Sequence, residues 1–340
     1  MTSDRPRLKK RGSGNGAATP HPTGVACIPS GCTLLDLVLG GGWAEKRIAN
    51  IVGDKSAGKT LLAIEASANF IHKYPKGRVK YREAESAFDR PYAKILGMPI
   101  DRVDFGDPIN TVEELFSDLS KSVRSSVPTL YIVDSLDALS DEAELDRDLN
   151  EPTYGTEKAR KLSQLFRRLV RQMASSNHTV IIISQIRSRI GGFGKGRTTV
   201  RAGGRALDFY ASQVVFLSHM GAITRVVDNV KRPVGLHIRA KCDKNKVGLP
   251  LREADFTLQF MYGIDDLVSC VTWLREINRL DDIGVGPKGT TSFIRDTNSL
   301  AGKEYVHAVN RVQNKVRDRW RSIETTFLPK RRKYGEAETR

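Results

Sequence analysis

The chain has 340 residues, of which 55 are Lys or Arg and 39 are Asp or Glu, and its formal net charge is +16. No apolar run approaches the roughly 20 residues that cross a bilayer, and the first residues lack the apolar core of a signal peptide, so we expect a protein that stays inside the cell. The excess of positive charge favours a polyanionic partner, either nucleic acid or an acidic membrane surface, with a soluble basic enzyme as the alternative.

The composition predicts three regions. Residues 1–24 are polar and basic, and we expect them to form a disordered arm. Residues 25–264 alternate short apolar stretches with amphipathic ones and should form one large core. Residues 265–340 should form a small basic helical region, with helices expected at 266–280 and 303–323.

The core is predicted to be an α/β domain. Its unbroken apolar stretches predict strands at residues 48–52, 78–82, 129–133, 179–184 and 213–217. Its amphipathic stretches predict helices near residues 61–73, 112–123 and 156–174. Apolar strands that alternate with helices are typical of a mostly parallel twisted sheet flanked by helices on both faces.

A glycine-rich turn joins the first predicted strand to the first predicted helix. Its residues fit a phosphate-binding loop at every constrained position: Gly53, Asp54, Lys55, Ser56, Ala57, Gly58, Lys59 and Thr60. In such a turn, backbone N–H groups and the helix N-terminus surround a polyphosphate. We expect Lys59 to contact the outer phosphates and the Thr60 hydroxyl to bind Mg²⁺. The turn therefore predicts a site for a nucleoside triphosphate.

Polar residues follow three other predicted strands. Asp134 is expected to hold Mg²⁺ directly or through water. Gln185 lies at the carboxyl edge of the sheet and is a candidate sensor of the γ-phosphate, although a surface glutamine is the alternative. Either Glu83 or Glu85 could orient the attacking water, and the pattern does not separate them because residues two apart point to the same side of a strand.

Several blocks of residues extend this pattern in a fixed order. They are Ile28-Pro29-Ser30-Gly31 with Gly40-Gly41-Gly42, Glu85-Ser86-Ala87-Phe88-Asp89 with Tyr92-Ala93, Val133-Asp134-Ser135-Leu136, Gln185-Ile186-Arg187 with Gly203-Gly204-Arg205, and Lys244-Asn245-Lys246. In wording, order and spacing these blocks resemble the RecA family of DNA recombinases over roughly residues 28–263. The resemblance implies a RecA-type P-loop ATPase core that uses ATP and Mg²⁺.

The resemblance also implies roles for individual residues. Glu85 matches the glutamate that activates water, Asp89 and Tyr92 match residues that bracket adenine, and Gln185 matches the γ-phosphate sensor.

The pair Lys244 and Lys246 matches lysines that, in the family's filament, reach into the ATP site of the neighbouring subunit. Cations there stabilise charge on the transferring phosphoryl group, so hydrolysis should require an assembled interface. On charge alone, the pair would be interpreted as a solvated basic turn.

Two segments resemble the DNA-binding loops of the family. Residues 186–205 are cationic and glycine-rich and could follow a phosphate backbone. The candidate DNA-binding residues there are Arg187, Arg189, Phe193, Lys195, Arg197, Arg201, Gly203, Gly204 and Arg205. The other loop is expected at about 147–157, where either Tyr154 or Gly155 takes the position of the residue that wedges between bases.

The resemblance implies a recombinase that forms filaments on single-stranded DNA, pairs it with homologous duplex and exchanges strands. We expect such a protein to be cytoplasmic and associated with the nucleoid, with no membrane partner. A ring-forming motor on the same core and an accessory protein that uses ATP only as structural glue are the alternatives. Basic residues near the C-terminus suggest a duplex-binding surface, against a solvated basic face: Arg311, Lys315, Arg317, Arg319 and Arg321, with Trp320.

Overall fold

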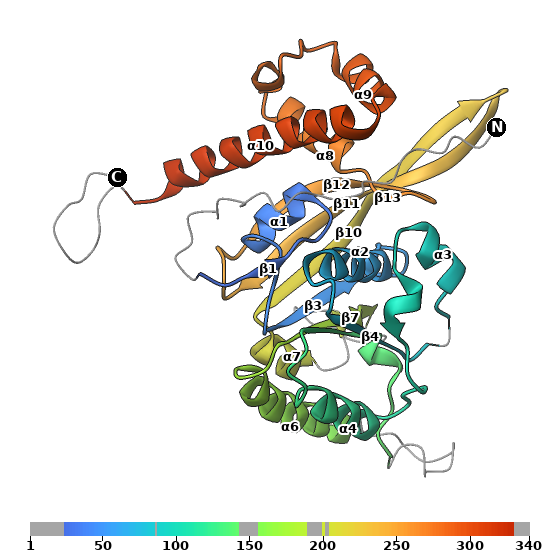
Figure 1. The fold of residues 1–340 in the computed structure, drawn as a ribbon, viewed down its shortest axis with the longest axis vertical. Helices are drawn as coiled ribbons and strands as arrows, with labels where there is room; N and C mark the ends of the chain where they lie inside the picture. The colour runs from blue at the N-terminus through green and yellow to red at the C-terminus, as the bar shows by residue number, and fades with distance from the viewer. Residues whose placement is uncertain (1–23, 86, 143–155, 189–198, 201–203, 330–340) are drawn as a thin grey trace. The chain divides into compact units, whose positions relative to one another are not determined.

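The structure is a computed structural model, and it describes residues 24–85, 87–142, 156–188, 199–200 and 204–329 (Figure 1). By their internal contacts these residues divide into two compact units, with the boundary between Asp266 and Leu267. Within the described ranges, no helix is long and apolar enough to cross a membrane.

A nine-stranded sheet forms the centre of the first unit. Parallel pairings join β10, β3, β7, β6, β4 and β5 in that order, and β11, β12 and β13 continue the sheet antiparallel from β10. The prediction of a mostly parallel sheet flanked by helices is confirmed. The strands are β3 (Ile48–Gly53), β4 (Arg78–Glu83), β5 (Val103–Asp104), β6 (Thr129–Asp134), β7 (His178–Gln185), β10 (Gln213–Val227), β11 (Val230–Asn245), β12 (Arg252–Gln259) and β13 (Gly263–Ile264).

Two short strand pairs lie outside this sheet. One joins β1 (Cys27–Ile28) to β2 (Trp43–Ala44), and the other joins β8 (Arg187–Ser188) to β9 (Thr199–Val200).

The three helices predicted in the core correspond to α2, α4 and α6. A capping box fixes the start of α4, because the Thr111 hydroxyl accepts the Glu114 N–H and the Glu114 carboxylate accepts the Thr111 N–H. The helical elements of this unit are α1 (Thr33–Leu39), α2 (Lys59–Lys73), α3 (Arg90–Ile95), η1 (Ile100–Arg102), α4 (Val112–Ser122), η2 (Leu136–Ala138), α6 (Thr156–Met173) and α7 (Gly204–Tyr210).

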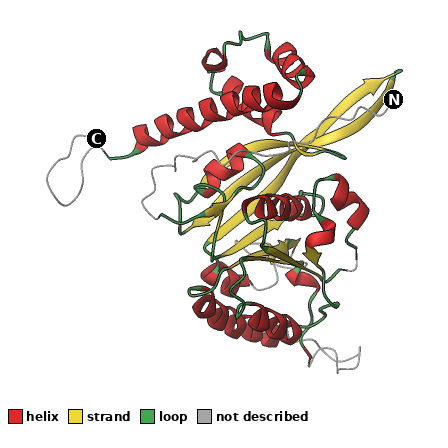
Figure 2. Cartoon of the chain, viewed as in Figure 1, coloured by secondary structure: helices red, strands yellow, loops and turns green. Residues whose placement is uncertain are grey.

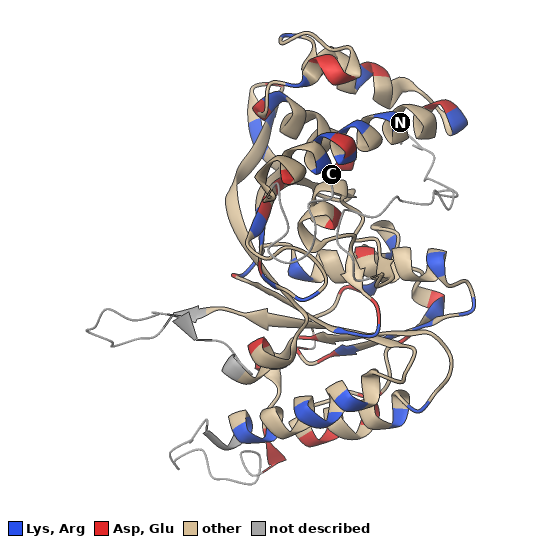
Figure 3. Ribbon diagram, turned by 90° about the vertical axis from the view of Figure 1, so that its left-hand side faces the viewer, with Lys and Arg blue, Asp and Glu red and all other residues tan. Residues whose placement is uncertain are grey.

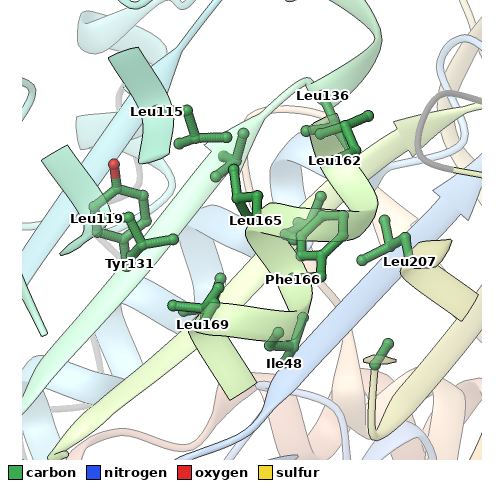
Figure 4. Close-up of a cluster of buried hydrophobic side chains, with 14 of the residues drawn as sticks. Ile48, Leu115, Leu119, Tyr131, Leu136, Leu162, Leu165, Phe166, Leu169 and Leu207 are labelled. Atoms are coloured by element: carbon green, nitrogen blue, oxygen red, sulfur yellow. The ribbon is translucent and has the colours of Figure 1, made fainter. Parts of the chain in front are cut away.

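The core of this unit lies where α4 and α6 cover one face of the sheet (Figure 4). Phe166 of α6 is fully buried there together with Tyr131 of β6. Side chains alternate between the faces of a strand, so Leu130 and Ile132 point to the opposite face, on which α2 lies (Figure 1). Burying one such side chain contributes about 1.5–3 kcal/mol, and the two apolar layers hold the strand ends in fixed positions.

The longest strands form a hairpin that the sequence did not predict. The sequence predicted only residues 213–217 of β10, which are the residues that pair with β3. The ladder between β10 and β11 continues to Val227 and Val230 and so extends past β3 (Figure 2). At its tip, Asp228 and Asn229 have φ values of 50° and 60°, the left-handed conformations that a tight two-residue hairpin turn requires.

The second unit consists of helices. They are α8 (Asp266–Glu276), η3 (Leu280–Ile283), α9 (Thr290–Ser299) and α10 (Gly302–Phe327). The prediction of one helix over 266–280 was wrong at its end, because Asn278 takes a left-handed φ of 55° and the Arg279 N–H turns back to the Leu274 carbonyl. Trp273 and Trp320 pack together with ring centroids 5.8 Å apart. Trp320 is 8% exposed and therefore lies inside this unit, contrary to its predicted place on a DNA-binding surface.

Candidate active site

The phosphate loop connects β3 to α2. Gly53 ends β3, and a side chain there would place its Cβ 2.9 Å from the Leu217 carbonyl oxygen on β10. Gly58 has φ +85°, and a Cβ there would lie 2.7 Å from Leu258 Cδ1 of β12. Close approach of the β10 backbone therefore requires glycine at position 53, whereas the left-handed backbone requires it at position 58.

The loop presents the N-terminus of α2 together with a buried cation. In the described part of the chain, no side chain caps α2 at Gly58, so the first N–H groups of this 15-residue helix remain for a ligand. Lys59 Nζ donates to the Asp54 carbonyl at 2.6 Å. Burial lowers the pKa of Lys59, and the carboxylates of Asp134 and Glu85 oppose that effect. This arrangement suits a phosphate group, which accepts N–H donors and needs positive charge.

Thr60 and Asp134 meet beside the loop, although 74 residues separate them. The Thr60 hydroxyl donates to Asp134 Oδ2 at 2.8 Å, and the Tyr81 hydroxyl donates to the same oxygen at 2.6 Å. Burial raises the pKa of Asp134, while the hydrogen bonds from Tyr81 and Thr60 lower it. Hydroxyl and carboxylate oxygens are the donors that Mg²⁺ prefers, so this pair fits the ion.

The structure distinguishes the two candidate glutamates at the end of β4, of which Glu83 is the last residue of the strand and Glu85 follows it. Glu83 Oε1 accepts the N–H groups of Glu85 and Ala87, each at 2.9 Å, and so holds its own turn together. Glu85 Oε1 instead accepts the Ser135 hydroxyl at 2.6 Å and the side-chain amide of Gln185. Only Glu85 therefore lies beside the other predicted catalytic groups with an exposed carboxylate.

Gln185 is fixed at the end of β7 from two directions. Its backbone N–H donates to Asp137 Oδ2 at 2.7 Å, while its side chain donates to Glu85. Two residues further along the chain, β8 begins within the segment predicted to bind DNA. A movement of the Glu85 carboxylate can therefore be transmitted to that segment through the side chain of Gln185.

The predicted adenine residues belong to α3. Asp89 Oδ1 caps this helix by accepting the Tyr92 N–H at 2.9 Å. Phe88, which precedes the cap, packs on Tyr81 with ring centroids 4.5 Å apart. Tyr81 also contacts Asp134, so Tyr81 connects Phe88, which precedes α3, to one of the predicted metal ligands.

Comparison with known proteins decides the family. The model of the RecA N-terminal domain matches residues 14–265. The chain belongs to the RecA family. It is 32% identical over 308 residues to Protein RecA of Streptomyces avermitilis, covering 87% of this chain and 77% of the relative. Protein RecA of Nostoc punctiforme is 36% identical over 253 residues (74% and 67%), and that of Francisella tularensis subsp. novicida is 38% identical over 242 residues (71% and 65%).

Two lysines of this RecA core lie away from the phosphate loop of their own subunit. Lys244 Nζ donates to the carbonyls of Asp208 and Phe209 at the end of α7, at 2.5 and 2.8 Å. Burial, with a smaller contribution from Lys246, lowers the pKa of Lys244 to about 8. Lys246 is exposed. A role for this pair in ATP hydrolysis would therefore have to be exerted on another subunit.

The predicted DNA-binding residues fall mostly outside the described part of the RecA core. Arg187 lies in β8, whose backbone pairs with Val200 of β9, and Gly204 and Arg205 open α7. The residues outside the described ranges are Tyr154, Arg189, Phe193, Lys195, Arg197, Arg201 and Gly203. The roles of all ten stay predictions.

Some residues that shape the RecA site were not predicted. Ser135 and Asp137 come one and three residues after Asp134. Ser135 holds Glu85 and Asp137 holds Gln185, so their position just after the strand was an available signal. Tyr81 contacts Asp134 from within β4. Leu258 covers Gly58 from 200 residues away, and nothing in the local sequence indicates that contact.

Proposed function

We propose that the chain is an ATP-dependent homologous recombination protein that forms filaments on single-stranded DNA and catalyses homologous pairing and strand exchange. As a RecA family member it is a DNA-dependent ATPase that uses ATP with Mg²⁺. We further propose that it acts on DNA in the cytoplasm, in association with the nucleoid. The observation that carries the proposal is the contact between Glu85 and Gln185, because it joins a candidate catalytic carboxylate to the start of the DNA-binding segment.

ATP binding is assigned to the phosphate loop and α3. The N–H groups of residues 53–60 and the Lys59 ammonium would surround the phosphates, with Lys59 exchanging the Asp54 carbonyl for a phosphate oxygen. Asp89 and Tyr92 would bracket the adenine. Thr60 and Asp134 would hold Mg²⁺, which neutralises phosphate charge when bound.

Hydrolysis is assigned to Glu85. Its exposed carboxylate would accept a hydrogen bond from the attacking water and take up a proton as the water adds to the γ-phosphate. Ser135 and Gln185 orient this carboxylate by donating to Oε1. Lys244 and Lys246 of an adjacent subunit would stabilise the developing charge, so turnover depends on assembly.

DNA binding is assigned to the segments at 147–157 and 186–205, with Tyr154 as a candidate wedge. Cations in the second segment would contact phosphates, and Gln185 would couple their arrangement to the bound nucleotide. The N-terminal arm at 1–24 and the basic region at 265–340 would add contacts to DNA. In the latter, Arg319 is already paired with Asp282, at 2.7 and 2.9 Å, and is therefore less suited to this role.

The decisive experiment measures ATP hydrolysis with no DNA, with single-stranded DNA and with duplex DNA, and images the same samples by electron microscopy. We expect single-stranded DNA to stimulate turnover and to be covered by helical filaments. Lys59→Ala is the control, because it removes the loop cation. Turnover without DNA, or closed rings, would instead indicate a ring-forming motor. Negligible DNA-stimulated hydrolysis in wild-type protein would indicate an accessory role.

A further inference from the structure

A hollow of about 610 Å³ lies within the C-terminal unit, between η3, α9 and α10. Its floor is apolar and consists of Ile283, Phe293, Leu300, Ala308 and Val312. Leu300 is 37% exposed although it belongs to this floor, so the hollow opens to solvent. A volume of this size lies in the range of ligand pockets and accommodates one or two large apolar side chains.

Positive charge borders the hollow on one side. Lys303, His307, Arg311 and Lys315 follow one another at intervals of four along α10, and residues so spaced share a face of a helix. Lys303 and Arg311 line the hollow itself, and a second, smaller hollow of about 310 Å³ continues past Arg311 to Lys315. Figure 3 shows the Lys and Arg positions on the helices of this unit in blue.

These cations are not neutralised by neighbouring carboxylates. Within the described residues, no Asp or Glu oxygen lies within 4.0 Å of the Lys303 or Arg311 side-chain nitrogens, whereas Arg319 on the same helix is paired with Asp282. The acidic residues that line the two hollows are Glu304 and Asp318, and Asp318 already contacts Arg321. The border therefore carries a net positive charge above an apolar floor.

We propose that this groove binds an acidic peptide segment of a partner protein, with a large apolar side chain of the peptide in the hollow and its carboxylates on the cations of α10. From Lys303 to Lys315 the helix advances by about 18 Å, which matches about five or six residues of extended peptide. Duplex DNA satisfies the cations but offers the floor no large apolar side group, since its bases are stacked inside and only thymine methyl groups reach the major groove. An acidic segment with an apolar anchor satisfies both parts.

The test uses the full-length protein and an array of fluorescein-labelled acidic hexapeptides, in which Leu, Phe or Trp occupies each position in turn. Fluorescence anisotropy measures their binding. We expect at least one peptide to bind with a Kd below about 0.1 mM, and replacing its apolar residue by Ser or its acidic residues by Asn should weaken binding at least about tenfold. An array without such a peptide overturns the proposal.

Two substitutions locate the bound peptide. Lys303→Glu reverses a cation of the border, and Leu300→Asp places charge on the open floor. Each should weaken binding of the peptide at least about tenfold, while the Tm of the protein stays close to that of wild type. Arg295→Glu on α9, whose side chain is 76% exposed and does not line the hollow, is the matched control and should leave binding unchanged.

Duplex DNA is measured on the same variants. If Lys303→Glu and Leu300→Asp both reduce affinity for a duplex oligonucleotide and neither affects the peptide, the groove serves nucleic acid and the proposal is wrong. Equal binding of the peptide by wild type and both variants also overturns it.

Discussion

The side-chain amide of Gln185 donates a hydrogen bond to the carboxylate of Glu85, across 100 residues of sequence. Glu85 follows β4 and Gln185 ends β7, and β6 lies between these strands in the sheet. Ser135, at the end of β6, donates to the same carboxylate oxygen. The ends of three strands therefore converge on Oε1 of Glu85, beside Thr60 and Asp134.

Glu85→Gln should lower single-strand-stimulated ATP hydrolysis by about 10²–10⁴-fold, because it removes the group that accepts the proton of water. The amide oxygen can still accept from Ser135 and Gln185, so ATP-dependent filament assembly should persist. Steady-state ATP hydrolysis and electron microscopy check the two parts. Glu83→Gln is the matched control and should stay close to wild type, because an amide oxygen still accepts the two backbone N–H groups. Unchanged turnover in Glu85→Gln would point to Glu83 instead.

Gln185→Ala should separate ATP binding from DNA binding. ATP affinity should be retained because Gln185 does not form the loop, whereas the tighter binding of single-stranded DNA in the presence of a nonhydrolysable ATP analogue should be lost. Allosteric coupling of this kind typically changes affinity by about 5–150-fold. DNA titrations with and without the analogue measure it. The matched control is Gln172→Ala, at an exposed glutamine of α6, which should keep the wild-type response. If Gln185→Ala still bound single-stranded DNA more tightly with the analogue, Gln185 would not transmit the nucleotide state to the DNA-binding segment.

Lys244→Ala combined with Lys246→Ala should leave ATP binding intact and abolish DNA-stimulated turnover, because both lysines lie away from their own phosphate loop. ATP hydrolysis by mixed filaments of two variants provides a sharper measurement. Glu85→Gln protomers retain both lysines, and the double variant retains Glu85, so mixed filaments should recover part of the turnover that each variant lacks. Mixtures as inactive as the separate variants would argue against a role across the subunit interface.

Buried His178 should make the fold sensitive to acid. The side chain is fully buried, its Nε2 lies 3.1 Å from the Ser122 hydroxyl, and its Nδ1 finds no hydrogen-bond partner among the residues that the structure describes. Burial, with a smaller contribution from Lys80, lowers the pKa of His178 from 6.5 to about 4. The unfolded chain therefore binds a proton that the folded chain excludes between these values, and the free energy of unfolding should fall by up to about 3 kcal/mol as pH drops from 6.5 to 4.

Thermal unfolding at pH 7 and pH 5 measures this effect. His178→Gln retains a polar partner for Ser122 but does not titrate, so the loss of Tm between the two pH values should be smaller than in wild type. His219→Gln, at an exposed position, should behave as wild type. An equal loss of Tm in His178→Gln would assign the acid sensitivity to other groups.

The sequence by itself determined the parts of the protein whose chemistry is local. Residues 53–60 had to form a phosphate loop between a strand and a helix, because glycines, one lysine and one threonine at these spacings meet the needs of a polyphosphate. The buried strands β3, β6 and β7 were evident from unbroken apolar runs, and Asp134 and Gln185 were placed at the sheet edge by the strands that they follow.

Only the tertiary structure decided the features that depend on distant contacts. Glu83 and Glu85 are two residues apart and were equivalent by pattern, whereas in the structure only Glu85 accepts hydrogen bonds from Ser135 and Gln185. The sequence pattern placed Trp320 on the surface of a basic helix, whereas in the structure its ring packs against Trp273. The apolar floor of the C-terminal groove combines Ile283, Phe293 and Leu300 from separate segments, and no periodicity within one segment encodes such a contact.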